Sequence, residues 1–466
     1  MVWYYRAFFL ICDRPKLVAI GVLWAMMWMS INAESALQKD DFFSSLHGWR
    51  LLLPYCAASF ASVWLLCLRV KPKIELWQLA LIGYAGFVLA RGMFLGIPLV
   101  ALHFHAAILC AITLLVLYNT LMAIDHSLSF SEVVLTLIST NFAFICALLL
   151  VFLPRDIFHS IISDAFTGYI SFSASLPTFG MASPRPTGIS RLLAVATLLI
   201  IAAFLSGTWR NYLAKVLIYF GIGMTLFYQA RGGVLALIVA GLFLLLVLPR
   251  RDRPNLGEVV RFFAGIVVAY VAILAFVLIG IMLKYVASDF DIINNLGVIS
   301  QKATTAYEGY QAGNDIVTSL AHSEIYVVVS RDLVPEMAGS GRLKLWINGW
   351  TAFLDEPILG LGGQADRSHI NQNVSNIFIY TLMCGGLVGA FFAVLAVAPS
   401  LRTAWMSVKN KYIGVGRVEQ FLLLSSLTIF AFLSARGFVE NSYALFNIDF
   451  LLAVPPIWYL SSKSCE

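Results

Sequence analysis

Long runs of apolar residues dominate this chain and restrict what it can fold into. A helix that crosses a bilayer needs roughly 20 apolar residues, because a helix rises about 1.5 Å per residue. Runs of this kind have cores at 17–33, 51–68, 76–94, 98–122, 132–153, 190–206, 214–230, 232–248, 261–286, 376–398, 420–438 and 441–460. We therefore predict an all-α, polytopic membrane protein with about twelve transmembrane helices.

The composition agrees with a lipid environment. The 466 residues are 60% hydrophobic and only 12% charged. A soluble domain carries about 25% charged residues, so half that amount cannot cover a solvated surface. The net charge of +6 is expected from Lys and Arg in cytoplasmic loops, and nucleic acid is not an expected partner.

Basic residues in the short loops indicate the orientation. They concentrate at the N-terminus and at 69–73, 210–215, 250–253 and 402–417. The positive-inside rule then places both termini in the cytoplasm. The predicted divisions are spans one to nine (1–286), an outer loop (287–375) and spans ten to twelve (376–466). A loop as long as the outer one is usually functional if it is ordered.

Arg231 stands at a predicted outer hairpin between two spans, within Ala230-Arg231-Gly232-Gly233. A guanidinium at that depth costs several kcal/mol unless it is paired or hydrated, which favours a functional role. The alternative is that Arg231 extends its charge to the outer headgroups.

Arg342, Trp346 and Trp350 are four residues apart in a predicted helix that Ser340 would cap. Arg binds phosphate through two parallel hydrogen bonds, and indole rings stack on sugars, so the set suits a phosphate with an attached sugar or lipid. The alternative is an interfacial helix with a Trp belt. The glycine cluster 360–363 that follows is a candidate for a mobile or anion-holding loop.

Histidines are the remaining candidates for chemistry. His369 lies just before span ten and can act as a general base near neutral pH, or it can simply be solvated. His103 and His105 are two apart on a predicted helix, point to different sides, and are interpreted as packing or interfacial residues. Arg436 and Glu440 are one turn apart and can form an ion pair near the outer surface. Ionic residues thus gather on one side of the membrane.

Four segments together resemble the bacterial O-antigen ligase and O-antigen polymerase family. They are Ala230-Arg231-Gly232-Gly233, Ser340-Gly341-Arg342 with Leu345-Trp346, Glu356-Pro357-Ile358-Leu359-Gly360-Leu361-Gly362, and Asn376 through Gly389. The resemblance covers roughly residues 190–440. This chain has Ser375-Asn376 where the family commonly has His-Asn, a histidine usually taken as the base. His369, or a carboxylate such as Glu324, Glu356 or Asp366, is then the alternative base, unless no strong base is needed.

The resemblance implies a membrane glycosyltransferase of the bacterial inner membrane. Its donor would be a glycan on undecaprenyl diphosphate, and its acceptor a sugar hydroxyl or the lipid A core. Arg231, Arg342 and His369 are the expected catalytic residues. Trp346, Trp350, Arg191, Arg436 and Asn376 are expected to bind substrate. Direct displacement would invert the anomeric centre, and no metal or other cofactor is implied.

Three functions remain open at this stage, besides that of a purely structural membrane subunit. The Ser375 position favours a polymerase slightly over a ligase that joins finished polymer to the lipid A core. A polysaccharide transporter or lipid flippase explains many spans and buried charge equally well. It predicts charged residues along a central path, whereas here most lie at the outer ends of the spans.

Overall fold

Helices make up the regular structure of the described residues in the computed structural model, without strands. The description covers residues 14–30, 48–162, 186–228, 231–248, 257–258, 260–280, 282, 342–370, 374–410, 416–438, 444 and 446–464. The helices are α2 (Pro15–Met29), α3 (Leu53–Leu68), α4 (Leu76–Phe94), α5 (Leu99–Ile124), α6 (Phe130–Ile162), α7 (Pro186–Leu205), α8 (Tyr212–Phe227), α9 (Arg231–Val247), the helix Val260–Gly280, α13 (Arg342–Asp355), α14 (Ala365–Ser368), α15 (Ile377–Asn410), α16 (Arg417–Gly437) and α17 (Ile448–Lys463). A short 3-10 turn, η2 (Gly48–Leu52), precedes α3.

Each of the predicted apolar runs overlaps one of these helices. Eight described helices are long and apolar enough to cross a membrane, and shorter apolar helices accompany them. The prediction of an all-α polytopic membrane protein is therefore confirmed. Some boundaries were wrong: α6 continues through Pro154 to Ile162, and α17 begins at Ile448 instead of at 441.

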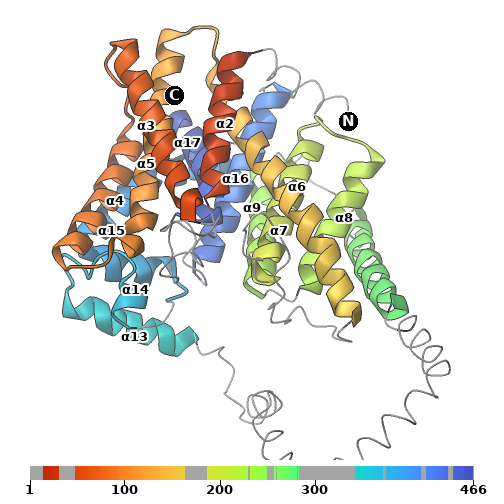
Figure 1. The fold of residues 1–466 in the computed structure, drawn as a ribbon. Coiled ribbons are helices and arrows are strands. Elements are labelled where there is room, and N and C mark those ends of the chain that lie inside the picture. The colour runs from red at the N-terminus through yellow and green to blue at the C-terminus, as the bar shows by residue number, and fades with distance from the viewer. Residues whose placement is uncertain are drawn as a thin grey trace, which may run out of the picture.

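The helices form a bundle in which α16 and α17 are enclosed by their neighbours (Figure 1). Residues 448–461 of α17 are all buried, so this helix has no lipid-facing side. A helix that is apolar all round is typical of such a central position. α13 and α14 lie across one end of the bundle, near the ends of α4 and α15. The other faces of the bundle carry exposed Leu, Val and Phe side chains, as a lipid-facing surface requires.

A buried asparagine joins three helices inside the bundle. Asn141 on α6 accepts hydrogen bonds from the indole N–H groups of Trp24 (2.8 Å) and Trp28 (2.7 Å) on α2. Its amide N–H₂ donates to the carbonyl of Leu451 on α17 (3.0 Å). Because buried Tyr and Trp polar groups need a partner, Asn141 satisfies two tryptophans at once.

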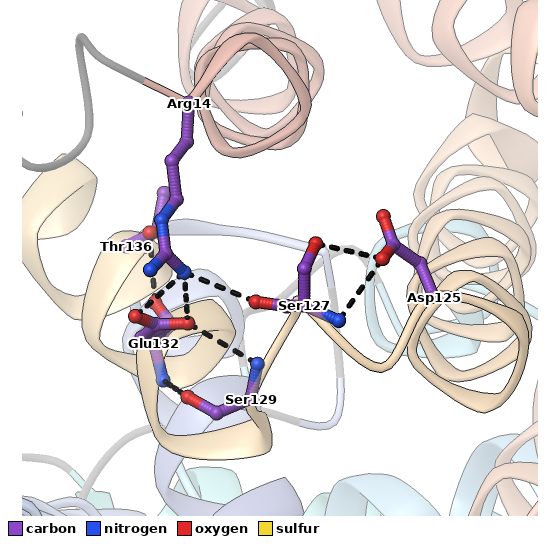
Figure 2. A network of polar contacts seen from close by, with 6 residues as sticks. All are labelled: Arg14, Asp125, Ser127, Ser129, Glu132 and Thr136. Carbon is purple, nitrogen blue, oxygen red and sulfur yellow. Dashed lines mark hydrogen bonds and ion pairs between the residues drawn. The ribbon is translucent and has the colours of Figure 1, made fainter.

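A polar network joins the start of α2 to the turn between α5 and α6 (Figure 2). Arg14 donates to the Glu132 carboxylate (2.7 Å) and to the Ser127 carbonyl (3.1 Å). Lys16 pairs with Asp125, and this contact holds the pKa of Asp125 well below its usual range. The network lies at the end of the bundle opposite α13, which is the predicted cytoplasmic side.

Replacing Asn141 with Leu should destabilise the fold. The substitution leaves two buried indole N–H groups unpaired, and each such group costs about 1–3 kcal/mol. The thermal midpoint of the purified protein in detergent should therefore fall by several degrees. Ser62→Ala is the matched control, because the exposed Ser62 hydroxyl bonds only within its own helix, to Ala58. Equal midpoints for Asn141→Leu and Ser62→Ala would contradict the bridging role.

Candidate functional site

Several helix ends that carry predicted site residues meet at the same end of the bundle. α8 ends at Phe227, which packs with Ile189 and Leu193 near the start of α7, and α9 begins at Arg231, so α7 and α9 both begin at that end. α16 ends there and α17 begins there, and α9 packs against both α16 and α7. α13 lies at this same end, beneath α4 and α15 (Figure 1). The positive-inside rule predicts that this is the extracytoplasmic end.

Two arginines and one aspartate from three helices meet at this end. Arg191 Nη1 of α7 lies 3.0 Å from Asp449 Oδ1 of α17, and Arg436 Nη1 of α16 lies 3.8 Å from the same oxygen. The Arg436 and Asp449 side chains are only 6% and 2% exposed. We call these three residues the arginine–aspartate cluster. It brings together Arg191 and Arg436, two of the predicted substrate-binding residues.

The local helix geometry favours each charge of this cluster. Asp449 stands in the first turn of α17, where the positive end of the helix dipole stabilises a carboxylate. Arg436 stands in the last turn of α16, where the negative end stabilises a cation. Asn447 caps α17 by accepting from the Phe450 N–H (3.0 Å). Burying charges still costs several kcal/mol per ion, so ionic residues in membrane segments usually mark a functional site.

Asn376 connects this cluster to the start of α15. Its side-chain oxygen accepts from the N–H groups of Phe378 (2.9 Å) and Ile379 (3.1 Å), and so caps the helix. Its amide N–H₂ donates to the carbonyl of Phe438 (3.0 Å), two residues after Arg436. Asn376 therefore fixes the end of α16 against the start of α15. Substrate contact by Asn376 stays a prediction.

α13 confirms the predicted helix that carries Arg342, Trp346 and Trp350. It begins at Arg342, and Ser340 lies outside the described residues. The Trp346 indole donates to the Ser375 carbonyl (3.3 Å), beside Asn376. Trp350 is 47% exposed, and its ring is tilted against that of Phe353. Arg342 and Trp346 thus stand on an element attached to the same end of the bundle.

The glycine cluster after α13 is neither a free loop nor an anion cradle, so that interpretation was wrong. α15 is interrupted at Gly386, where φ is 58° and ψ is −160°. Segment 356–363, which we call the clasp, pairs with the interruption. Leu361 N donates to Met383 O and Gly362 N to Cys384 O, at 2.9 Å each. Leu387 N and Val388 N donate to the carbonyls of Pro357 (2.9 Å) and Ile358 (3.2 Å).

The clasp requires glycine because the two backbones nearly touch. A Cβ on Gly360 would lie 2.4 Å from Gly386 N, and a Cβ on Gly386 would lie 2.3 Å from Ile358 O. Both residues also have positive φ, which glycine adopts without strain. The Pro-(x)₂-Gly-x-Gly pattern of the sequence is thus a backbone-pairing motif in this structure.

The candidate bases differ strongly in environment. His369 is exposed at the C-terminal cap of α14. Glu356 is about half exposed and lies 3.4 Å from Arg91. Asp366 on α14 is 1% exposed, and this burial raises its pKa to about 6, against the opposing effects of Arg367 and the Val374 N–H. Glu324 lies outside the described residues.

Several sequence expectations can be compared directly with the contacts. His103 is buried and bonds to the Tyr55 hydroxyl (3.0 Å), and His105 is fully buried, as expected for packing residues. The expected partner of Arg436, Glu440, lies outside the described residues, as does the Arg231 side chain. Among the described residues, Asp449 lies 3.8 Å from Arg436. Sequence reasoning missed Asp449, although an acidic residue within an apolar run was a usable signal.

The fold and these ionic contacts define a polytopic helical membrane protein with its buried charges gathered at one end. Residues 216–394 match the sequence model of a family described as O-antigen ligase. The matched region contains Arg231, Arg342, Trp346, Trp350, His369 and Asn376. The match confirms the resemblance to that family over this region, and it supports a membrane enzyme of the general O-antigen ligase and polymerase type. No curated protein matches the chain.

Asp366 should make the stability of this end of the protein depend on pH. Its folded-state pKa of about 6 exceeds the ordinary value of 3.8, so folding favours the protonated carboxyl. This stabilisation is fully present below about pH 4 and is lost as the pH rises to about 6. It amounts to on the order of 2–3 kcal/mol. Asp366→Asn should therefore raise the thermal midpoint at pH 7.5, and the gain should shrink at pH 4.5.

The control for this prediction is Asp355→Asn, which removes an exposed carboxyl at the end of α13. It should change the midpoint equally at both pH values. A gain for Asp366→Asn that is the same at pH 4.5 and pH 7.5 would show that the buried carboxyl does not carry this pH dependence.

Proposed function

We propose that the chain transfers a glycan from an undecaprenyl diphosphate donor to a sugar hydroxyl, on the outer face of the bacterial inner membrane with both termini in the cytoplasm. The family of residues 216–394 supports this class of reaction. The observation that carries the proposal is the convergence of Arg191 and Arg436 on Asp449 at the covered end of the bundle.

The departing diphosphate develops negative charge, which must be stabilised as the glycosidic bond breaks. Guanidinium groups held in place before the reaction stabilise such charge without further reorganisation. Asp449 pairs with Arg191 at 3.0 Å and lies 3.8 Å from Arg436, so its charge keeps both guanidinium groups at this site, and Arg presents planar N–H donors that match phosphate oxygens. We assign Arg191 and Arg436 to the diphosphate, beside Asn376 at the joined ends of α15 and α16.

Arg231 and Arg342 complete the proposed cationic set. Arg231 begins α9, a helix that packs against α16 and α7, which carry the two clustered arginines. The N-terminus of α9 adds the positive end of a helix dipole there, which favours an anion. Arg342 begins α13, and Trp346 and Trp350 follow it at helical spacing. We assign the two indoles to sugar rings of the glycan.

A base removes the proton of the acceptor hydroxyl as its oxygen attacks the anomeric carbon. His369 keeps this proposed role, since it is exposed on the same outer segment. Asp366, three residues earlier, is the alternative that the structure favours over Glu356, because Glu356 lies beside Arg91. Direct displacement gives an inverted product, and the proposed residues act without a metal.

Polymerase and ligase activities share this site and differ in the acceptor. We favour the polymerase, on the ground that Ser375 stands where the family histidine is expected. The ligase, which joins polymer to the lipid A core, is the competing outcome of the experiment below. A transporter is disfavoured, because the described buried arginines lie at the end of the bundle rather than along its length.

The test uses a deletion strain complemented by wild type, Arg436→Ala, Arg191→Ala or the control Arg210→Ala. Arg210 is an exposed arginine on the opposite side, where it bonds to the carbonyls of Phe204 and Leu205. Both site variants should lose at least 90% of the surface glycan ladder at matched expression, and Arg210→Ala should keep it. Arg436→Lys should recover little, because lysine lacks the planar fork.

The lipid-linked material that accumulates identifies the reaction. A single lipid-linked repeat unit indicates a polymerase, and lipid-linked polymer indicates a ligase. A full ladder in cells that carry Arg436→Ala or Arg191→Ala at normal expression would contradict the assignment of the cluster. An unchanged ladder in the deletion strain itself would contradict both enzyme functions.

A further inference from the structure

The outer part of α15 is separated from the rest of that helix. The interruption at Gly386 removes the continuous ladder of helical hydrogen bonds, so residues 377–385 form their own short helical segment. In a membrane, each backbone group freed in this way needs another partner. The clasp provides four of them, through Leu361, Gly362, Pro357 and Ile358. The orientation of the outer segment of α15 therefore depends on the clasp.

The outer segment of α15 carries part of the proposed site. Asn376 caps it and bonds to Phe438, next to Arg436. α13 packs on it closely, since a Cβ on Gly349 would lie 2.9 Å from side-chain atoms of both Ile379 and Val374. α13 in turn carries Arg342 and Trp346. A tilt of the outer segment would therefore move these groups relative to the arginine–aspartate cluster.

One cation on α4 holds the clasp at its middle. Arg91 Nε donates to the carbonyl of Gly360 (3.0 Å), and Nη2 lies 3.4 Å from the Glu356 carboxylate. The Arg91 guanidinium also lies 5.7 Å from the ring centre of Phe94. Its side chain is 13% exposed. Gly360 lies against Gly386, since a Cβ on Gly360 would be 2.4 Å from Gly386 N, so Arg91 acts directly behind the interruption in α15.

We propose that Arg91 is a positioning residue for the glycan transfer. Arg91 holds the Gly360 carbonyl in place, and Gly360 in turn holds the outer segment of α15. The position of that segment determines how Asn376 and α13 lie relative to Arg436. This inference rests on the proposed function. Arg91 binds the clasp from the α4 side and does not touch the reacting atoms in this proposal. It therefore affects the rate by positioning the groups that do. A misplacement of about 1 Å can cost on the order of 10²-fold in rate.

The experiment measures transfer by the full-length protein in nanodiscs, with the lipid-linked repeat unit extracted from the same host as substrate. Arg91→Gln should lower kcat by about 10- to 100-fold and change the KM for the donor by less than about twofold. Arg91→Lys keeps a cation and an N–H donor for Gly360 and should stay within about threefold of wild type. Glu356→Gln should have a smaller effect than Arg91→Gln, because that ion pair is partly exposed. Arg210→Gln is the control.

Amide hydrogen exchange provides a readout apart from activity. In Arg91→Gln, the N–H groups of Leu361, Gly362, Leu387 and Val388 should exchange at least tenfold faster than in wild type, while those of α16 stay unchanged. A global loss of protection, or wild-type exchange in the clasp, would contradict the local role of Arg91.

Two outcomes separate this inference from the proposed function. If Arg436→Ala abolishes transfer while Arg91→Gln keeps the wild-type kcat, or changes only KM, the positioning role is wrong and the proposed site stands. If Arg436→Ala and Arg191→Ala both keep full transfer, the proposed function of the cluster is wrong, and the inference about Arg91 is lost with it.

Discussion

The need to pair every backbone polar group inside the membrane governs this structure. Twelve apolar runs satisfy it by forming helices, in which each N–H finds a carbonyl four residues earlier. The helical hydrogen bonding of α15 is interrupted at Gly386. Main-chain hydrogen bonds between α15 and the clasp residues Pro357 to Gly362 pair the backbone groups that the interruption frees. The outer part of the enzyme is thereby attached to the bundle through backbone geometry that only glycine permits at Gly360 and Gly386.

The arginine–aspartate cluster is the second constraint, and it follows from the first. Because the membrane excludes water, a guanidinium there must be paired, and Asp449 provides that pairing for helices that are distant in sequence. The same pairing orients the guanidinium groups before substrate arrives. In the proposed function, stability and catalysis therefore draw on the same three residues, and Asn376 connects them to α15.

The sequence predicted those features that depend on local composition. Apolar length located every described helix that is long enough to cross a membrane, and residue spacing located the helix of Arg342, Trp346 and Trp350. It missed Asp449, which lies inside an apolar run and whose partners come from α7 and α16. The sequence also indicated a mobile or anion-holding loop where the structure has the clasp. The positive φ at Gly386 and the pairing of α15 with segment 356–363 are non-local properties that local sequence does not predict. The roles of Arg231 and His369 stay predictions.

The most direct test of the account is the affinity for undecaprenyl diphosphate, the proposed leaving group, measured by calorimetry on protein in nanodiscs. Wild type should bind it at least tenfold more tightly than Arg436→Ala. Undecaprenol, which lacks the phosphates, should bind both proteins equally. Equal affinity of both proteins for the diphosphate would contradict the claim that the arginine–aspartate cluster is the anion site.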